Sequence, residues 1–338
     1  MSSAWRERLG EQAGEALRVR YPLARLSVPR PLEGGRSGVT LVARLHGVGP
    51  DREVVLKAAP EGRRAAGRHD VLRQADVLEA LDGVEDVVTP GVLARVQGTD
   101  TMFVMERAPG EAVEPVLDSG TVVLPAALVR ERATRAARML AALHAVDLDA
   151  APATRTAPVA DVGEELDRWS TTAAAADPAV AAGIDVLYER LLHTVPDESS
   201  APVLVHGDYR LGNIVFDGAV PTGLIDWEIW GVTRAAVDLG WFMVFCDADA
   251  FPTVGGPVEG LPCADELLDV YRAAGGSTPR NLAWFDAFGR FKMAAIMSHN
   301  LRRHREGRHH DPYQERLPPT IARLVETGRE RLGRRAAR

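Results

Sequence analysis

The sequence of 338 residues has little cysteine and no long apolar run. Its two cysteines, Cys246 and Cys263, stand in unlike contexts without metal-site spacing, which excludes a disulfide framework and suits a reducing compartment. No run of about 18 apolar residues is present, and the first residues contain no apolar signal core. We therefore expect a cytoplasmic protein without a membrane partner.

Lysine is almost missing as well. The 40 lysines and arginines include only two lysines, Lys57 and Lys292, a bias typical of a GC-rich genome. Each remaining lysine is informative, because a compact ammonium cannot always be exchanged for a guanidinium. The formal net charge of −7 lacks the positive excess that contacts with nucleic-acid phosphates require. The composition therefore predicts no nucleic-acid partner.

The hydrophobic pattern divides the chain into two parts. Short apolar runs typical of strands occur between residues 39 and 59 and at 102–106, before a Pro-Gly break. Beyond this break the chain is rich in alanine at helical spacing. We predict a bilobal α+β fold with a small β-rich N-terminal lobe (1–108) and a larger, mainly helical C-terminal lobe (109–338). Helices are expected over 4–20, 68–82, 125–146, 161–195, 264–274, 280–306 and 316–334, with a loop at 150–160.

Two polar motifs follow apolar, β-branched runs in the C-terminal part. One extends from His206 through Asp208 to Asn213, and the other is Asp226-Trp-Glu. The first has the spacing His-x-Asp-x-x-x-x-Asn, in which a carboxylate faces a substrate hydroxyl and the amide turns back to a metal ion. With the second carboxylate, Asp226, the pattern indicates a site for Mg²⁺ and a nucleotide. The alternative is a β-hairpin with polar loop residues.

These motifs resemble those of the aminoglycoside phosphotransferase and choline-kinase-like branch of the protein-kinase-like fold. The likeness runs from about Leu26 to Gly307 and is greatest with bacterial phosphotransferases related to the kinase-like domain of some acyl-CoA dehydrogenases. It implies an ATP- or GTP-dependent kinase that phosphorylates a hydroxyl of a small molecule, a metabolite or an antibiotic, with Mg²⁺ as cofactor. The Asp-Trp-Glu sequence and the lack of a segment ending in Ala-Pro-Glu favour such a substrate over a protein. We expect a monomer or a homodimer.

The resemblance also assigns roles in the C-terminal lobe. Asp208 would be the catalytic base or hydroxyl orienter, and Asn213 and Asp226 would bind Mg²⁺. His206 would support the catalytic loop. Arg210 would reach a phosphate or the substrate, or would be a salt-bridge partner. Asp238, which begins a later helix, is expected to brace the loop.

The nucleotide site is expected in the N-terminal lobe. A glycine-rich loop would cover the phosphates, Lys57 would hold them, and backbone at the hinge would bind adenine. The residues implied are Gly34, Gly35, Ser37, Gly38, Lys57, Gln74, Glu106 and Ala108. Relatives carry a lysine-binding glutamate at the position of Gln74. We therefore expect Lys57 to be held by Gln74, or by Asp70 or Asp76.

Two other functions stay open from the residues alone. A metal-dependent phosphohydrolase would use the same carboxylates and recruit residues from a cluster comprising His299, His304, His309, His310 and Asp311. No usual metal-binding spacing occurs there, and a solvated helix face is the alternative. A catalytically weak nucleotide-binding pseudokinase is kept open by Gln74.

The only feature of the sequence that bears on the identity of the acceptor is the charge of two stretches. Residues 290–308 carry six cations, Lys292 among them, against one acid, whereas residues 247–269 carry acids without lysine or arginine. A polycationic aminoglycoside would meet like charge at the basic stretch. We therefore expect a neutral or anionic hydroxylated acceptor, while the acidic stretch favours a polycation.

Overall fold

The computed structural model describes residues 2–32, 39–62, 70–197 and 200–333, and their fold is α+β. The chain divides into two compact units. Unit 1 comprises Met1–Gly110, Asp149–Thr156 and Thr222–Ile229, and unit 2 comprises Glu111–Leu148, Ala157–Pro221 and Trp230–Arg338. The lobe boundary at residue 108 stays a prediction. The units differ from it by placing two short later segments in unit 1.

Within the described residues of unit 1, six strands form an antiparallel sheet of order β1-β3-β4-β6-β5, with β2 paired to β3. The central strand β4 places Lys57 opposite Thr40 on β3 and Phe103 on β6. The strands are β1 (Arg25–Leu26), β2 (Arg30–Pro31), β3 (Val39–His46), β4 (Arg52–Ala58), β5 (Val92–Val96) and β6 (Met102–Glu106).

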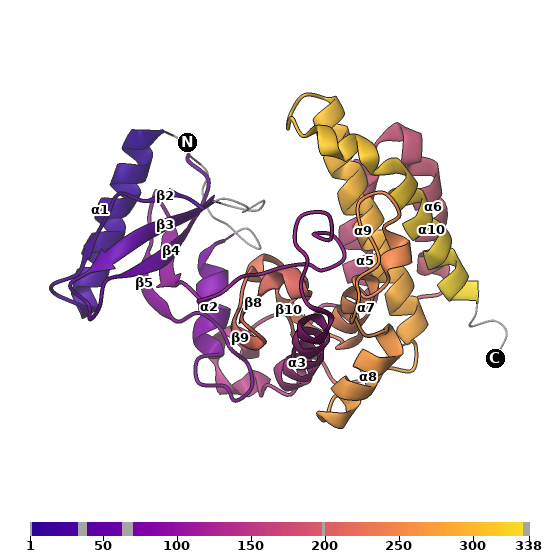
Figure 1. Cartoon of the computed structure of the whole chain (residues 1–338), viewed down its shortest axis with the longest axis horizontal. Helices are drawn as coiled ribbons and strands as arrows, with labels where there is room; N and C mark the ends of the chain where they lie inside the picture. The colour runs from indigo at the N-terminus through magenta and orange to yellow at the C-terminus, as the bar shows by residue number, and fades with distance from the viewer. Residues whose placement is uncertain (1, 33–38, 63–69, 198–199, 334–338) are drawn as a thin grey trace. The chain divides into compact units, whose positions relative to one another are not determined.

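Helix α1 (Ser3–Arg20) packs on this sheet (Figure 1). Trp5, Leu9, Ala13 and Leu17 recur every fourth residue, so they lie on one face and join the core formed with the strands. Helix α2 (Leu72–Ala80) buries part of its surface in the same unit. The expected helices at 4–20 and 68–82 are therefore present, the second over a shorter described range.

Unit 2 is mainly helical, and its core surrounds α9 (Leu282–Arg305). This helix packs against α5, α6, α7 and α10, which explains why its residues are buried on several sides (Figure 1). Two of these helices start with side-chain caps, Asp161 before α5 and Asp177 before α6. The remaining helices are α3 (Ala126–His144), α5 (Val162–Ala174), α6 (Pro178–His193), α7 (Ala236–Val244), α8 (Ala264–Ala273) and α10 (Pro318–Gly333).

Short elements carry the two sequence motifs. Strand β7 (Val203–Val205) pairs with β10 (Gly231–Thr233), and β8 (Ile214–Asp217) pairs with β9 (Val220–Leu224). Single turns of 3₁₀ helix are η2 (Leu148–Ala150), η3 (Leu211–Asn213), η4 (Trp227–Ile229), η5 (Ala248–Ala250) and η6 (Pro312–Arg316). The expected loop at 150–160 is wrong in part, because Pro152 opens the short helix α4 (Pro152–Arg155).

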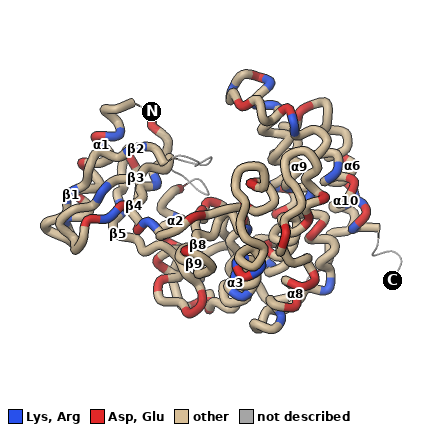
Figure 2. The backbone as a smooth tube through the Cα atoms, viewed as in Figure 1, with Lys and Arg blue, Asp and Glu red and all other residues tan. Residues whose placement is uncertain are grey.

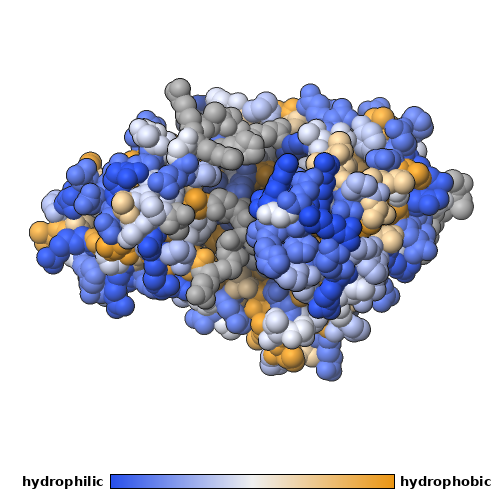
Figure 3. All heavy atoms as spheres, turned by 90° about the horizontal axis from the view of Figure 1, so that it is seen from above, coloured by the Kyte–Doolittle hydropathy of each residue, from blue (hydrophilic) through white to orange (hydrophobic). Residues whose placement is uncertain are grey.

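The surface carries charges of both signs. Basic and acidic residues alternate along the helices of unit 2 (Figure 2). The face drawn in Figure 3 is largely hydrophilic, with apolar residues in small separate groups. None of the helices in the described part of the chain is both long and apolar enough to cross a membrane.

Candidate active site

Lys57 meets two carboxylates in unit 1. Its Nζ lies 3.1 Å from Asp226 Oδ1 and 3.3 Å from Glu228 Oε1. The residue is 7% exposed. Burial alone would lower the pKa of Lys57, but the two carboxylates outweigh burial and raise it above its ordinary value. The ammonium is therefore charged at neutral pH, as a phosphate ligand has to be.

Asp226 has a backbone conformation that is uncommon for a residue with a side chain. Its φ of +69° lies in the left-handed region. Such residues cluster at functional sites, where the surrounding structure holds them in place. The buried Trp227 donates its indole N–H to Leu224 O at 2.9 Å and so fixes the turn that presents Asp226 and Glu228.

The partners of Lys57 expected on helix α2 are wrong. Gln74 is buried on α2 but forms no hydrogen bond with Lys57 among the contacts of the described residues. Asp76 forms an ion pair with an arginine of β5 at 2.6 Å, and Asp70 caps the start of α2. A carboxylate is a stronger partner for an ammonium than an amide is, which favours Glu228 over Gln74.

The other residues predicted for nucleotide binding are only partly described. The Glu106 N–H donates to Gly91 O at 2.9 Å, so this donor is not available to adenine. The backbone that continues to Ala108 follows strand β6 as expected. The predicted phosphate-covering loop lies outside the described residues, with Gly34, Gly35, Ser37 and Gly38.

Asp238 braces the predicted catalytic loop in unit 2. It is fully buried on α7 and accepts hydrogen bonds from the backbone N–H groups of His206 at 2.7 Å and Gly207 at 2.8 Å. Burial would raise the pKa of Asp238, but the hydrogen bond and charge of His144 lower it below its ordinary value. Gly207 has a φ of +81°, which glycine adopts without strain. The structural role expected for Asp238 is confirmed.

Both carboxylate oxygens of Asp208 accept hydrogen bonds. Oδ1 accepts the indole N–H of Trp241 at 2.7 Å, and Oδ2 accepts the side-chain amide of Asn213 at 2.8 Å. The same amide also donates to the Asp208 main-chain oxygen at 2.8 Å, which closes the loop. These two donors fix the orientation of the carboxylate group. The Asp208 side chain remains 23% exposed, so a small molecule can reach it.

His206 and Arg210 lie on either side of Asp208 in sequence and differ in surroundings. His206 is fully buried, and its Nδ1 accepts the Asp208 N–H at 3.2 Å, as a loop-supporting residue would. Arg210 lies with Nε 3.4 Å from Asp208 Oδ1 and Nη1 3.6 Å from Glu114 Oε2. Arg210 is thus a salt-bridge partner within unit 2, one of the two roles expected for it.

Three residues of unit 2 were missed by the sequence motifs: Glu114, Trp241 and Lys292. Glu114 is 3% exposed and accepts the Gly212 N–H at 3.0 Å. Burial raises the pKa of Glu114 to about 7. Nothing in the sequence around Glu114 or Trp241 distinguishes them from core residues. For Lys292 the scarcity of lysine was a usable signal.

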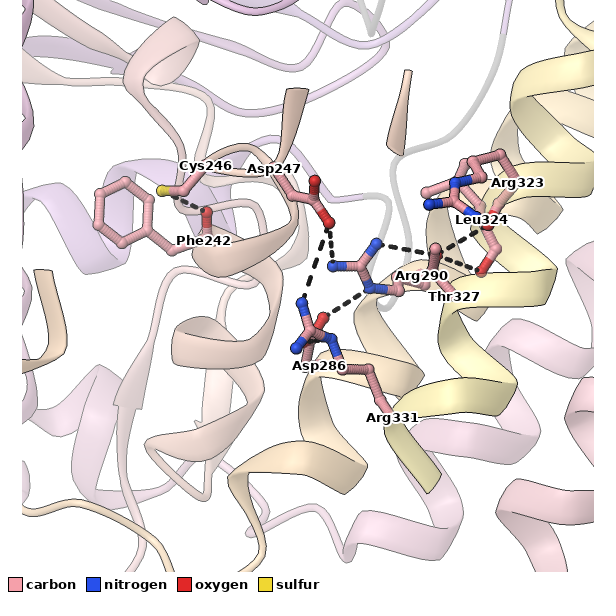
Figure 4. A network of polar contacts seen from close by, with 9 residues as sticks. All are labelled: Phe242, Cys246, Asp247, Asp286, Arg290, Arg323, Leu324, Thr327 and Arg331. Carbon is pink, nitrogen blue, oxygen red and sulfur yellow. Dashed lines mark hydrogen bonds and ion pairs between the residues drawn. The ribbon is translucent and has the colours of Figure 1, made fainter. Parts of the chain in front are cut away.

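Most cations of the basic stretch 290–308 are buried or ion-paired. Arg290 is 1% exposed, and Figure 4 shows its guanidinium enclosed by Asp247, Asp286 and Thr327, at 2.7, 2.8 and 2.9 Å. Arg331 joins this network through Asp286 at 2.9 Å (Figure 4). The stretch also contains buried Lys292 and ion pairs of Arg302, Arg305 and Arg308 with glutamates or an aspartate. The charge argument for a neutral or anionic acceptor therefore loses its basis.

The histidine cluster has local partners. His304 Nδ1 accepts the Asp311 N–H at 3.0 Å, and the His304 and His310 rings lie 5.6 Å apart. In the part of the chain that the structure describes, no group of three or more histidine, cysteine or acidic side chains is arranged to hold a metal ion.

Comparison with known proteins identifies relatives over most of the chain. The model of the phosphotransferase enzyme family matches residues 28–288. Acyl-CoA dehydrogenase family member 11 of Mus musculus is 26% identical over 292 residues, which cover 81% of this chain and 37% of that protein. The chain thus spans little more than a third of this relative's length.

Solved structures share the fold. A protein of Ralstonia eutropha JMP134, provisionally assigned as an aminoglycoside phosphotransferase, aligns with a TM-score of 0.73 at 20% identity, covering 94% of this chain and 98% of that chain. A variant of aminoglycoside phosphotransferase APH(4)-Ia, solved in a ternary complex with AMP-PNP and hygromycin B, gives a TM-score of 0.59 at 15% identity, covering 94% and 98%. The predicted α+β kinase-like fold is confirmed.

Proposed function

Because the chain belongs to the phosphotransferase enzyme family, we propose that it is a small-molecule kinase that transfers the γ-phosphoryl group of ATP or GTP to a hydroxyl group. The observation that carries this proposal is the state of Asp208. A braced loop presents its carboxylate, each oxygen of which has a fixed donor, Trp241 or Asn213. An oriented, ionised carboxylate within reach of solvent is the group that phosphoryl transfer to an alcohol requires.

Asp208 orients the acceptor and takes its proton. The acceptor oxygen attacks the γ-phosphorus, the bond from phosphorus to the β–γ bridging oxygen breaks, and the hydroxyl proton passes to the Asp208 carboxylate. The hydrogen bonds from Trp241 and Asn213 hold this carboxylate in the orientation in which it can take the proton. His206 and Asp238 hold the loop and do not take part in proton transfer.

Mg²⁺, when bound, would neutralise charge on the phosphate oxygens. Asn213 and Asp226 would hold the ion, since both offer hard oxygen donors. Among the described contacts the Asn213 amide uses its nitrogen toward Asp208, and its Oδ1 takes no hydrogen bond. The side chain of Asp226 faces the Lys57 ammonium within unit 1. These observations support the assignment.

Lys57 would bind the α- and β-phosphates in place of its present contact with Asp226. Glu228 then keeps one contact with the ammonium and holds it in position. The complex of APH(4)-Ia with AMP-PNP and hygromycin B supports a nucleotide and a hydroxylated acceptor as the two substrates. Backbone near Ala108 is the proposed adenine contact.

The test is nucleotide consumption with MgATP and MgGTP over hydroxylated metabolites, hydroxyacyl thioesters, aminoglycosides and macrolides. With the acceptor found, Asp208→Asn should lower kcat by about 10²–10⁴-fold, the usual contribution of a positioned base. Nucleotide affinity, measured by calorimetry, should change little. Asp217→Asn is the matched control, since Asp217 is an exposed residue at the end of β8. Full turnover by Asp208→Asn would overturn the mechanism, and nucleotide binding without consumption for any acceptor would overturn the kinase in favour of a binding protein.

A further inference from the structure

A buried ammonium lies against the catalytic loop. Lys292 on α9 is 3% exposed, and its Nζ donates a hydrogen bond to the Gly207 carbonyl. The same nitrogen lies 3.8 Å from the centre of the Trp241 ring and 4.8 Å from that of the Trp169 ring. One carbonyl and two indole faces therefore surround the charge. All four residues belong to unit 2.

Burial of such a charge disfavours the folded state. Moving an ammonium out of water disfavours the charged form, and apolar residues of similar volume often stabilise a core better than buried charges do. The chain uses arginine for almost every other cation, and its one other lysine is Lys57 of the proposed phosphate site. Each lysine thus lies, within its own unit, beside residues proposed for phosphate binding or catalysis, which points to a functional reason for keeping a compact ammonium at position 292.

Two paths connect Lys292 to Asp208. The first is Gly207, whose carbonyl accepts from Lys292 and whose N–H donates to Asp238 at 2.8 Å. Because the two peptide groups that flank Gly207 are each held by one of these hydrogen bonds, the backbone that leads into Asp208 is fixed. It thereby limits the positions open to the carboxylate.

The second path is the Trp241 indole. The Lys292 ammonium lies over its face, and its Nε1–H donates to Asp208 Oδ1 at 2.7 Å. A cation over the face is attracted by the ring quadrupole and holds the ring in place. It also draws electron density from the ring, which makes the N–H a stronger donor toward the carboxylate.

We infer that Lys292 is a positioning residue for Asp208, acting through the Gly207 carbonyl and the Trp241 indole, and that it acts in its protonated form. The inference rests on the proposed function, because it concerns the residue proposed as base. Neutral Lys292 keeps at most the hydrogen bond to Gly207 and loses the attraction to both indoles. Deprotonation therefore loosens the set of contacts around Asp208.

The surroundings of Lys292 set the pH at which this happens. Burial is the largest effect and lowers the pKa of Lys292 to about 8. The charged groups that face it come from the catalytic loop, α7 and α5, and comprise Asp208, Asp238, Glu165 and Arg168. The three acids favour the ammonium and the arginine opposes it. Activity should therefore fall as pH rises through about 8.

The scarcity of lysine allows a direct measurement. Protein labelled with ¹³C at lysine Cε should give two signals, and the Lys57→Arg variant assigns the one that remains to Lys292. The Lys292 signal should titrate near pH 8. The ¹⁵N signal of the Trp241 indole, assigned with Trp241→Phe, should shift with the same midpoint. A Trp241 signal unaffected by the Lys292 titration would overturn the inference, and this readout needs no substrate.

Kinetics test the consequence for catalysis. Lys292→Met should lower kcat by about 10- to 100-fold, as expected when a catalytic group is misplaced, with the KM for nucleotide unchanged. The activity that remains in Lys292→Met should no longer decline as the pH rises above 8. Lys292→Arg, if folded, keeps a positive charge at this position above pH 8, so its activity should not decline there either. Arg302→Met on the same helix is the control, because Arg302 forms a surface ion pair with Glu306.

The outcomes separate the two proposals. If the parent protein turns over and Lys292→Met retains its full kcat and its pH profile, the positioning role is wrong while the kinase stands. If no acceptor gives turnover that depends on Asp208, the kinase is wrong, and the indole titration still decides whether Lys292 controls the contact to Asp208. Thermal melts of each variant establish that it is folded.

Discussion

At the scale of single residues, the environment of Lys57 depends on two carboxylates rather than on the helix residue that usually holds such a lysine. Asp226 and Glu228 lie 3.1 and 3.3 Å from its ammonium. Both come from the short Asp-Trp-Glu turn, which the Trp227 indole holds. The turn therefore carries a proposed metal ligand and the lysine partner together, so Gln74 on α2 does not have to supply a charge.

Lys57→Arg should impair catalysis although it preserves the charge. A planar guanidinium is larger than an ammonium and cannot occupy the same buried position between the two carboxylates. We expect kcat/KM for nucleotide to fall about 10- to 100-fold, the worth of one hydrogen bond to a charged group. Arg52→Lys on the same strand is the control, since Arg52 is only partly buried and bonds a loop carbonyl. Equal kcat/KM for Lys57→Arg and parent would show that a compact ammonium is not needed.

At the scale of elements, the close approach of α7 and α9 brings the Asp208 contacts together. Helix α7 carries Asp238 and Trp241, and α9 carries Lys292. Glycines allow the two backbones to approach. A Cβ added at Gly240 would lie 2.3 Å from Phe285 O, and one at Gly289 would lie 2.9 Å from Gly240 O. Any larger residue at this crossing has to push the helices apart.

Gly240→Ala should therefore destabilise the protein by about 1–3 kcal/mol, since the added methyl meets backbone atoms that cannot rotate away. Gly183→Ala in α6 is the matched control, because its Cβ would lie 3.6 Å from the nearest atom, an ordinary contact. This control should be neutral or stabilising by up to about 1 kcal/mol. Urea unfolding of both variants measures the difference. Equal stabilities would contradict the described crossing.

At the scale of the whole molecule, two buried groups should govern the pH dependence of stability. The pKa of Glu114 is raised from 4.5 to about 7, and that of Lys292 is lowered from 10.5 to about 8, in both cases chiefly by burial. Between pH 4.5 and 7 the folded protein keeps a proton on Glu114 that the unfolded chain has released. Between pH 8 and 10.5 the unfolded chain keeps one on Lys292 that the folded protein has lost.

The free energy of unfolding should therefore fall between pH 4.5 and 7 and rise between pH 8 and 10.5. Each effect is at most about 3 to 4 kcal/mol, the difference between the two pKa values multiplied by about 1.4 kcal/mol. Denaturant unfolding at pH 5, 7.5 and 10 tests this prediction. In Glu114→Gln the free energy of unfolding should no longer fall between pH 5 and 7.5, and in Lys292→Met it should no longer rise between pH 7.5 and 10. If the free energies of unfolding of both variants follow the same pH dependence as that of the parent protein, the prediction is contradicted.

The sequence alone determined the local features. Apolar alternation and helical spacing indicated the strands around Lys57 and most helices, because these patterns depend on residues a few positions apart. The spacing from His206 to Asn213 indicated, for the same reason, the loop that we propose to be catalytic. The resemblance to known phosphotransferases indicated that Asp238 braces this loop, which its hydrogen bonds to the loop backbone confirm.

Only the tertiary structure decided which distant side chains meet. Lys292 and Gly207 are 85 positions apart, and Lys57 and Glu228 are 171 apart. Such contacts depend on how helices and strands pack, which no local pattern specifies. The basic appearance of 290–308 was misleading for this reason, since helix packing buries Arg290 and Lys292 and pairs Arg290 with acids. Charge in a sequence becomes charge at a surface only where the fold leaves it without a partner.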